Sequence, residues 1–324
     1  MQTQALSGCV ISLDPLVIMA SRNDDAHLGM ATVAPELFTD RPSLHFIKPT
    51  HSLKIYFDSL QKHLEEACKR LPRAKFVIMA NEEWELVELQ ARGITAFVAN
   101  NFILADENTF DVQENVTRQH DALYNAMFRK LKNHHLCAEI ASLALIYYRQ
   151  ETYSEPECER SVRKLLVQAT YLNETKYSTY RELTADEVAS AINSSHVGLC
   201  MSAAEGAMRA CAEFLLCGVP VVTVPAIGGR ARYLHLGNSR TVESTQSAVA
   251  AAVAELKALD MNPYDIREEF LNIIDFERRN FLAYINASIK RQFGVSNCVK
   301  NFSALRGASR YQTIEQWKQW LGAA

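Results

Sequence analysis

The sequence predicts an α/β protein with parallel sheets in two domains, and three features support this. Its 324 residues suit two domains of ordinary size, each able to bury its own core. Short apolar runs alternate with amphipathic stretches, as in parallel sheets that have helices on both faces. The pattern at 196–224 predicts a strand, a helix and a second strand in succession, which is the repeating unit of an α/β fold.

The first third of the chain contains several such alternations. Apolar residues recur at helical spacing over Leu53–Arg70, which predicts a helix that Pro72 ends. Asn81 caps the next predicted helix, and Gly93 stops it. The expected elements are the strands Val10–Leu13, Leu16–Met19, Leu44–Ile47, Lys75–Ala80 and Ile94–Val98, and the helices Leu53–Arg70 and Glu82–Arg92.

Residues 100–116 are polar and show no clear periodicity, which predicts a linker. The expected domains are therefore 1–115 and 116–324. The final helices follow the second domain in sequence but are candidates for packing back on the first.

The second half of the chain continues the alternation. The pattern predicts a helix at Asn133–Leu143, an apolar run at Leu143–Tyr148 and a strand at Leu165–Leu172. The remaining expected helices are Ala185–Ile192, Val249–Leu259, Arg267–Arg291 and Ile314–Trp320.

Two carboxylates, Glu205 and Glu213, mark the helix of the strand–helix–strand unit. Eight helical residues rise about 12 Å and turn about 80° beyond two full turns, so the two side chains suit different parts of one elongated ligand. Gly206 leaves space for a ligand at the expected helix start. Burying Glu213 is costly unless a donor hydrogen-bonds it; a surface Glu213 and a helix-capping Glu205 are the alternative.

The end of this helix is also marked. Gly218 is expected to cap it, and Pro220 prevents its continuation into the strand Val219–Val224.

These residues resemble the donor-site signature of retaining GT-B glycosyltransferases of the family-four type (glycosyl transferases group 1). The signature consists of Glu-x7-Glu at 205–213, Gly-x-Pro-Val-Val at 218–222 and Gly-Gly-Arg at 228–230. The resemblance implies a GT-B fold, with two Rossmann-like domains whose parallel sheets face a central cleft. The first domain would then lie on the acceptor side, and the second would bind a nucleotide sugar.

The resemblance also implies roles for individual residues. Glu205 would lie beside the donor sugar, and Glu213 would bind the ribose hydroxyls. Arg129 and Lys132 match the place of the cations that stabilise the departing diphosphate, with Lys130 as a substitute for either. A solvated basic segment is the alternative for these cations. The implied reaction retains the anomeric configuration, by front-face attack with an oxocarbenium-like transition state.

Further candidates rest on their places in the expected fold. His27 follows the first strands and is expected to meet the donor sugar and acceptor, and His134 is expected to hydrogen-bond a phosphate. Asn173 is expected near the nucleobase. The other expected donor-site residues are Gly206, Ala207, Met208, Gly229 and Arg230; for the last two, a plain turn is the alternative.

Composition and missing motifs exclude several function classes. The net charge of −3 gives no electrostatic footprint for nucleic acid. The eight cysteines form no CxxC pair and suggest reduced, buried thiols. The chain contains no P-loop, no GxGxxG and no G-x-S-x-G. It also contains no Asp-x-Asp, so metal-independent chemistry without a cofactor is expected.

The expected partners are a UDP- or GDP-sugar donor and a glycan, lipid-linked or small-molecule acceptor hydroxyl. The N-terminus lacks a basic signal-peptide region, and no run of 18 apolar residues occurs, so a cytoplasmic location is expected. Peripheral membrane contact stays open, because many such enzymes act on lipid-linked acceptors.

Two other functions fit the same pattern. A nucleotide-sugar epimerase of the GT-B fold would share the diphosphate-binding helix, but it needs acid–base carboxylates from both domains. A catalytically silent GT-B protein that binds nucleotide or glycan is the second alternative, since the expected first domain is short.

Overall fold

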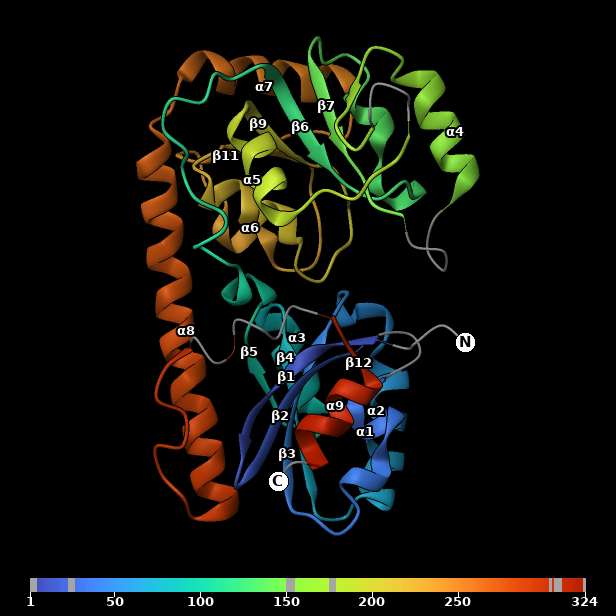
Figure 1. Ribbon diagram of the computed structural model, residues 1–324, viewed down its shortest axis with the longest axis vertical. Coiled ribbons are helices and arrows are strands. Elements are labelled where there is room, and N and C mark those ends of the chain that lie inside the picture. The colour runs from blue at the N-terminus through green and yellow to red at the C-terminus, as the bar shows by residue number, and fades with distance from the viewer. Residues whose placement is uncertain are drawn as a thin grey trace. The chain divides into compact units, whose positions relative to one another are not determined.

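The computed structural model describes residues 5–22, 27–149, 155–174, 179–302, 305 and 311–322. The chain divides into two compact units. The first unit comprises Met1–Leu104 and Ile274–Ala324, two segments that are far apart in sequence, and the second comprises Ala105–Ile273 (Figure 1). The boundary predicted from the sequence is at 115/116, whereas residues 105–115 belong to the second unit.

The sheet of the first unit has six strands in the order β12-β1-β2-β3-β4-β5. β2 to β5 are parallel, but β1 pairs antiparallel with β2 and with β12, so the sheet is mixed rather than purely parallel. The reason is the connection Asp14-Pro15, because two residues can join only antiparallel neighbours. The strands are β1 (Ala5–Leu13), β2 (Leu16–Arg22), β3 (Ser43–Pro49), β4 (Ala74–Ala80), β5 (Ala96–Val98) and β12 (Tyr311–Thr313).

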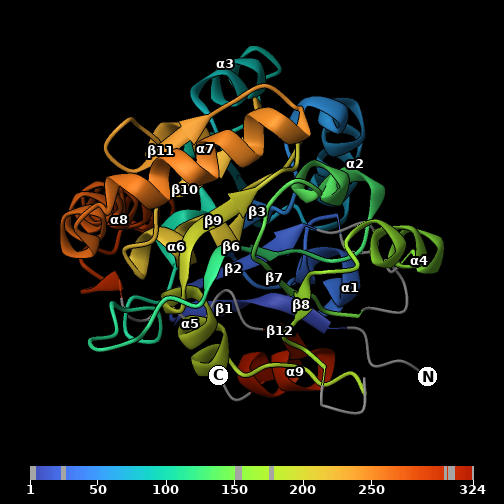
Figure 2. The same ribbon diagram turned by 90° about the horizontal axis from the view of Figure 1, so that it is seen from above.

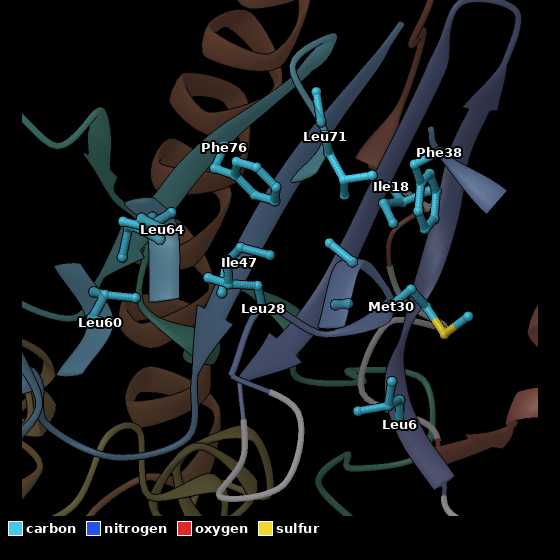
Figure 3. Close-up of a cluster of buried hydrophobic side chains, with 14 of the residues drawn as sticks. Leu6, Ile18, Leu28, Met30, Phe38, Ile47, Leu60, Leu64, Leu71 and Phe76 are labelled. Atoms are coloured by element: carbon cyan, nitrogen blue, oxygen red, sulfur yellow. The ribbon is translucent and has the colours of Figure 1, made fainter. Parts of the chain in front are cut away.

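Successive strand residues of the first unit point to opposite faces, and each face has its own core. Ile18 and Ile47 belong to the core covered by the short helices, while Met19 and Phe46 belong to the core covered by α8 (Figure 3 shows the first of these). The helices that supply residues to the first core are α1 (Met30–Val33), α2 (Phe57–Arg70), α3 (Glu83–Ala91) and α9 (Ile314–Gly322).

The sheet of the second unit has six parallel strands in the order β8-β7-β6-β9-β10-β11. This order is 3-2-1-4-5-6 along the chain, the arrangement of a Rossmann-like domain. The strands are β6 (His120–Asn125), β7 (Leu143–Ile146), β8 (Thr170–Tyr171), β9 (Ser195–Cys200), β10 (Val221–Thr223) and β11 (Ser239–Thr241).

Helices cover both faces of this sheet. α7 packs against β6, β9, β10 and β11, and α5 and α6 pack against β9. Figure 2 shows α7 on one face of the sheet and α5 and α6 on the other. The helices are α4 (Pro156–Leu165), α5 (Ala185–Asn193), α6 (Arg209–Leu216) and α7 (Gln246–Leu259); α8 (Pro263–Phe293) starts in this unit and ends in the first.

α6 ends as expected but begins later than expected. Gly218 has a φ of 67°, its N–H donates to Leu215 O at 3.1 Å, and the Val219 N–H donates to Phe214 O at 2.9 Å. These bonds form a Schellman motif, which stops the helix before β10. The helix starts at Arg209, however, so Glu205 is in the preceding loop and not on α6.

Two other predicted elements are wrong in whole or in part. The helix predicted at Asn133–Leu143 is a short 3₁₀ helix, His134–Cys137, and Asn133, with a φ of 50°, lies outside it as its N-cap residue. The strand predicted at Leu165–Leu172 is confirmed only as the two residues of β8, because Leu165 is the last residue of α4 and a turn follows it, in which the Ala169 N–H donates to Leu166 O at 3.1 Å.

No helix in the described part of the chain is long and apolar enough to cross a membrane.

Candidate functional site

The candidate site is at the carboxyl ends of β6 and β9, which are neighbours in the sheet of the second unit. β7 and β8 extend the sheet on one side, and β10 and β11 extend it on the other. At such a switch point the loops leave toward opposite faces, and open α/β sheets bind ligands in the resulting crevice. The loops after β6, β9 and β10 supply the residues of the site.

The loop between β9 and α6 is held by the loop that follows β10. The Glu205 N–H donates to Ile227 O at 3.1 Å, and the Ile227 N–H donates to Ala203 O at 3.0 Å. Gly228 has a φ of 118°, and a Cβ there would lie 1.6 Å from the Glu205 carbonyl oxygen, so only glycine fits. The two bonds form a parallel β-bridge between Ala204 and Ile227, which holds this part of the loop outside a helix, and α6 starts only at Arg209.

Glu205 forms an ion pair with Lys132, although the resemblance implied separate roles for them. The carboxylate accepts from Lys132 Nζ, and the two side chains are 11% and 14% exposed. Tyr124 Oη donates to the Lys132 carbonyl oxygen, and Asn133 Nδ2 donates to the Met201 carbonyl oxygen at 3.0 Å. The structure therefore brings Lys132 and Glu205 together where β6 and β9 end.

Glu213 is on α6 and only 7% exposed. Within the described chain, no N–H or O–H group donates to its carboxylate. Burial raises the pKa of this carboxyl from 4.5 to about 7, and the charge of Arg209, one turn earlier, opposes the rise. Glu213 is thus a largely buried carboxylate that receives no hydrogen bond from the described part of the chain.

Arg230 is buried and holds the loops after β9 and β10 together. Its guanidinium donates to Ser202 O at 2.7 Å and to Val224 O at 3.0 Å, and it lies 3.8 Å from Met208 Sδ. None of the ion pairs of the described residues involves it, so its positive charge is not neutralised by a contacting carboxylate. Gly229, with a φ of 89°, forms the turn that precedes it.

Arg129, also in the loop after β6, has a different carboxylate partner from Lys132. Its Nε is 3.6 Å from Glu155 Oε1, and the Lys130 N–H donates to Glu155 Oε2 at 3.1 Å. Glu155 directly precedes α4. The two predicted diphosphate cations therefore each have a carboxylate partner, on different elements.

His134 is buried between aromatic rings. Its ring centroid is 4.9 Å from that of Tyr124 and 5.2 Å from that of Phe128. Burial lowers its pKa from 6.5 to about 4, so the imidazole is neutral at pH 7. Its Nδ1 has no hydrogen-bond partner among the residues that the structure describes. His134 thus adds no positive charge to the site.

Asn173 uses both ends of its amide within the protein. Oδ1 accepts from the Tyr147 N–H at 2.6 Å, and Nδ2 donates to Arg181 O at 2.9 Å. The side chain therefore ties the loop after β8 to the end of β7.

The remaining predicted residues divide between the units. Gly206 and Ala207 are in the same loop as Glu205, and Met208 is the N-cap residue of α6. His27 is in the first unit, where its ring stacks on that of His63 with centroids 3.6 Å apart and planes 6° from parallel.

Two residues that shape the site were not predicted from the sequence. Tyr124 and Asn133 fasten the loop after β6. Gly228 was identified as part of the signature, and the structure gives its role, which is to allow the approach of the Glu205 backbone. A signal existed for Asn133, because Asn is the common non-glycine residue in the left-handed region. The contact of Tyr124 depends on tertiary structure and leaves no local signal.

Among the described residues, no group of three or more His, Cys, Asp or Glu side chains is arranged to hold a metal ion.

No protein-family model and no curated protein sequence matches this chain. Solved structures do match it. Sucrose-phosphate synthase from Thermosynechococcus elongatus has a TM-score of 0.58 and 14% identity over 84% of this chain and 74% of that chain. A UDP-forming α,α-trehalose-phosphate synthase from Burkholderia xenovorans has a TM-score of 0.55 and 13% identity over 85% and 73% of the two chains. HepE from Anabaena, in complex with UDP, has a TM-score of 0.52 and 12% identity over 76% and 72%.

At these identities the comparisons show the fold. The chain has two Rossmann-like domains and adopts the GT-B fold of these glycosyltransferases.

Proposed function

We propose that this chain is a glycosyltransferase that takes a sugar from a nucleotide-sugar donor, which binds at the loops after β6, β9 and β10. The observation that carries the proposal is Glu213, a buried carboxylate to which no described residue donates a hydrogen bond. Such a group is costly in the folded protein unless a ligand supplies donors. The adjacent hydroxyls of a ribose offer two O–H donors to one carboxylate.

Charges nearby suit a diphosphate. As the anomeric bond breaks, the leaving diphosphate gains negative charge, and fixed cations stabilise that charge most in the transition state. Lys132 and Arg129 provide cations on the loop after β6, and the N-terminus of α6 adds its dipole. Buried Arg230 adds positive potential from the loop after β10. Glu205 is assigned to the hydroxyls of the donor sugar.

We assign a retaining, metal-independent mechanism as part of the same proposal, on the strength of the sequence signature. Front-face attack needs a stabilised leaving group and an acceptor hydroxyl on the same face of the sugar, and it needs no covalent nucleophile. The acceptor is a hydroxyl of a glycan, a lipid-linked saccharide or a small molecule. His27 in the first unit is the candidate contact for it. A cytoplasmic location belongs to the proposal as well, and peripheral contact with a membrane would follow if the acceptor is lipid-linked.

The comparisons support UDP as the first nucleotide to test. One similar protein is described as UDP-forming, and another was solved with UDP. A catalytically silent GT-B protein and an epimerase are the competing functions, and the experiment below separates them.

The proposal is tested by thermal shift with UDP, GDP, ADP, CMP and their sugars, on wild type and Glu213→Ala. We expect one nucleotide to raise the melting temperature of wild type but not that of the variant. No shift with any nucleotide would overturn the donor site. Binding followed by sugar transfer, with the product anomer read by NMR, supports a transferase. Binding without turnover would indicate a silent protein, and interconversion of donor epimers without acceptor would indicate an epimerase.

A further inference from the structure

We propose that the Lys132–Glu205 ion pair makes the site favour an intact nucleotide sugar over the nucleoside diphosphate left after transfer. This inference rests on the proposed donor site and gives two of its residues a role in specificity. In the structure the Glu205 carboxylate already holds Lys132 Nζ. A diphosphate that binds Lys132 must therefore compete with Glu205 for the same cation.

Lys132 can exchange Glu205 for a diphosphate only by movement of side chains, because the backbones on both sides of the ion pair are held in place. Tyr124 bonds to the Lys132 carbonyl, and Ile227 bonds to the backbone of the Glu205 loop. Gly228 lies against the Glu205 carbonyl with no space for a larger residue. With both backbones fixed, Lys132 can turn toward a ligand only by breaking its contact with Glu205.

Breaking the pair has a different cost for the two ligands. Both side chains are largely buried, at 11% and 14% exposure, so Glu205 cannot gain full hydration in exchange for its contact with Lys132. A nucleoside diphosphate brings only more negative oxygens to this point, which repel the carboxylate. An intact donor also brings an uncharged sugar, whose hydroxyl groups can donate to Glu205 in place of Lys132. Only the intact donor offsets the cost.

If Glu205 competes for Lys132, its carboxylate weakens binding of the nucleoside diphosphate product. Without the carboxylate charge, Lys132 is available to any diphosphate, and the enzyme loses its preference for the sugar-bearing ligand. A site in which Glu205 instead positions Lys132 for phosphate would respond in the opposite way, because removal of Glu205 would then weaken product binding.

The test is calorimetric titration of UDP and UDP-glucose, or of GDP and GDP-mannose if guanine is the base found by thermal shift. We expect Glu205→Gln to bind the nucleoside diphosphate about fivefold more tightly than wild type. We expect the same variant to bind the nucleotide sugar no more tightly than wild type. In a Lys132→Met background, Glu205→Gln should leave nucleoside diphosphate affinity unchanged, since the competition no longer exists.

Two further variants serve as controls. Asp121→Asn removes another lysine–carboxylate pair, with Lys257 at 2.5 Å, at the opposite end of β6, and should alter neither affinity. Glu205→Asp keeps the charge on a shorter side chain and should give a smaller gain in affinity for the nucleoside diphosphate. This variant keeps the inference testable if Glu205→Gln does not fold.

The outcomes separate the two proposals. Equal or weaker nucleoside diphosphate binding by folded Glu205→Gln, with binding by wild type intact, would overturn the ion-pair inference and leave the donor site standing. A gain that persists in the Lys132→Met background would also overturn it. Absence of binding by wild type to every nucleotide would overturn the donor site itself.

Discussion

Glu85 on α3 and Glu213 on α6 are both buried glutamates on a helix that follows a strand, yet their surroundings are opposite. Glu85 is fully buried and accepts four hydrogen bonds. Its Oε1 accepts from Leu53 N and Ser52 Oγ at 2.7 and 3.0 Å, and its Oε2 accepts from Asn81 N and Nδ2 at 2.8 and 3.2 Å. Glu213 accepts none from the described residues.

This difference distinguishes a structural carboxylate from a binding one. Glu85 joins the loop after β3 to the loop after β4, so its four donors offset much of the cost of its burial. Burial still raises its pKa, and those same bonds oppose the rise. Glu213 bears the cost of burial without such compensation, as its pKa of about 7 reflects. A fold keeps such a group where function requires it.

The largest expected effect is the loss of stability on replacing Glu85 with Gln. The amide of Gln has one NH₂ group, which cannot accept a hydrogen bond. Depending on the orientation of the amide, this group faces two donors that include the backbone N–H of either Leu53 or Asn81. We expect the first unit to lose about 3 kcal/mol of its free energy of unfolding. Urea denaturation followed by tryptophan fluorescence measures this unit alone, because Trp84, Trp317 and Trp320 are the three tryptophans of the chain and all belong to it. An unchanged urea midpoint would show that these bonds contribute little.

Replacing Glu213 with Gln should raise the free energy of unfolding, whereas the same change at Glu85 should lower it. The folded pKa is raised from 4.5 to about 7, so the folded protein binds the proton more tightly than the unfolded chain. The destabilisation is therefore absent below about pH 4.5, grows between these pKa values and is complete above about pH 7. At pH 8 we expect Glu213→Gln to stabilise the second unit by about 1 to 2 kcal/mol, while nucleotide binding is weakened.

Circular dichroism melts of wild type and Glu213→Gln between pH 5.5 and pH 8 measure this effect, with the separate fluorescence signal of the first unit as the control. The stability difference between the two proteins should shrink as the pH falls. A Gln variant that is less stable than wild type at pH 8 would mean that the carboxylate has donors in the folded protein, and would break the contrast with Glu85.

The contrast shows how far the sequence could lead. The strand–helix–strand unit was predictable because Gly218 and Pro220 act locally, and both carboxylates of its signature were identified from spacing. Glu85 was not identified, since its acidic neighbours Glu82, Glu83 and Glu88 make it look like one more exposed side chain. Its donors come from residues that are distant in sequence, and no local pattern reports them.

The same cause explains the errors within the site. The late start of α6 depends on pairing between Ala203, Glu205 and Ile227, which are in separate loops. The ion pair of Glu205 with Lys132 spans the switch point between β9 and β6, so it follows from the strand order and not from either segment. Position in the fold was predictable; the partners of each polar group were not.

Donor affinity should depend on pH through Glu213. Ribose hydroxyls donate best to the charged carboxylate, so binding lowers its pKa and affinity rises as the pH rises through about 7. Between pH 6 and pH 8 we expect about a tenfold gain in affinity for the nucleotide sugar, whose diphosphate does not titrate in this range. Calorimetric titration at several pH values measures it, and Glu213→Gln should bind weakly and independently of pH. A flat wild-type profile would place the ribose away from Glu213.

The smallest expected effect concerns Arg209, whose positive charge opposes the rise in the pKa of Glu213. Arg209 is exposed, so solvent screens its influence. We expect Arg209→Gln to move the midpoint of the affinity profile to higher pH by less than about half a unit. The same titrations measure this, and high salt should shift wild type in the same direction but leave the variant's profile in place. An equal loss of affinity at every pH, with the midpoint unmoved, would mean that Arg209 acts on the ligand rather than on Glu213.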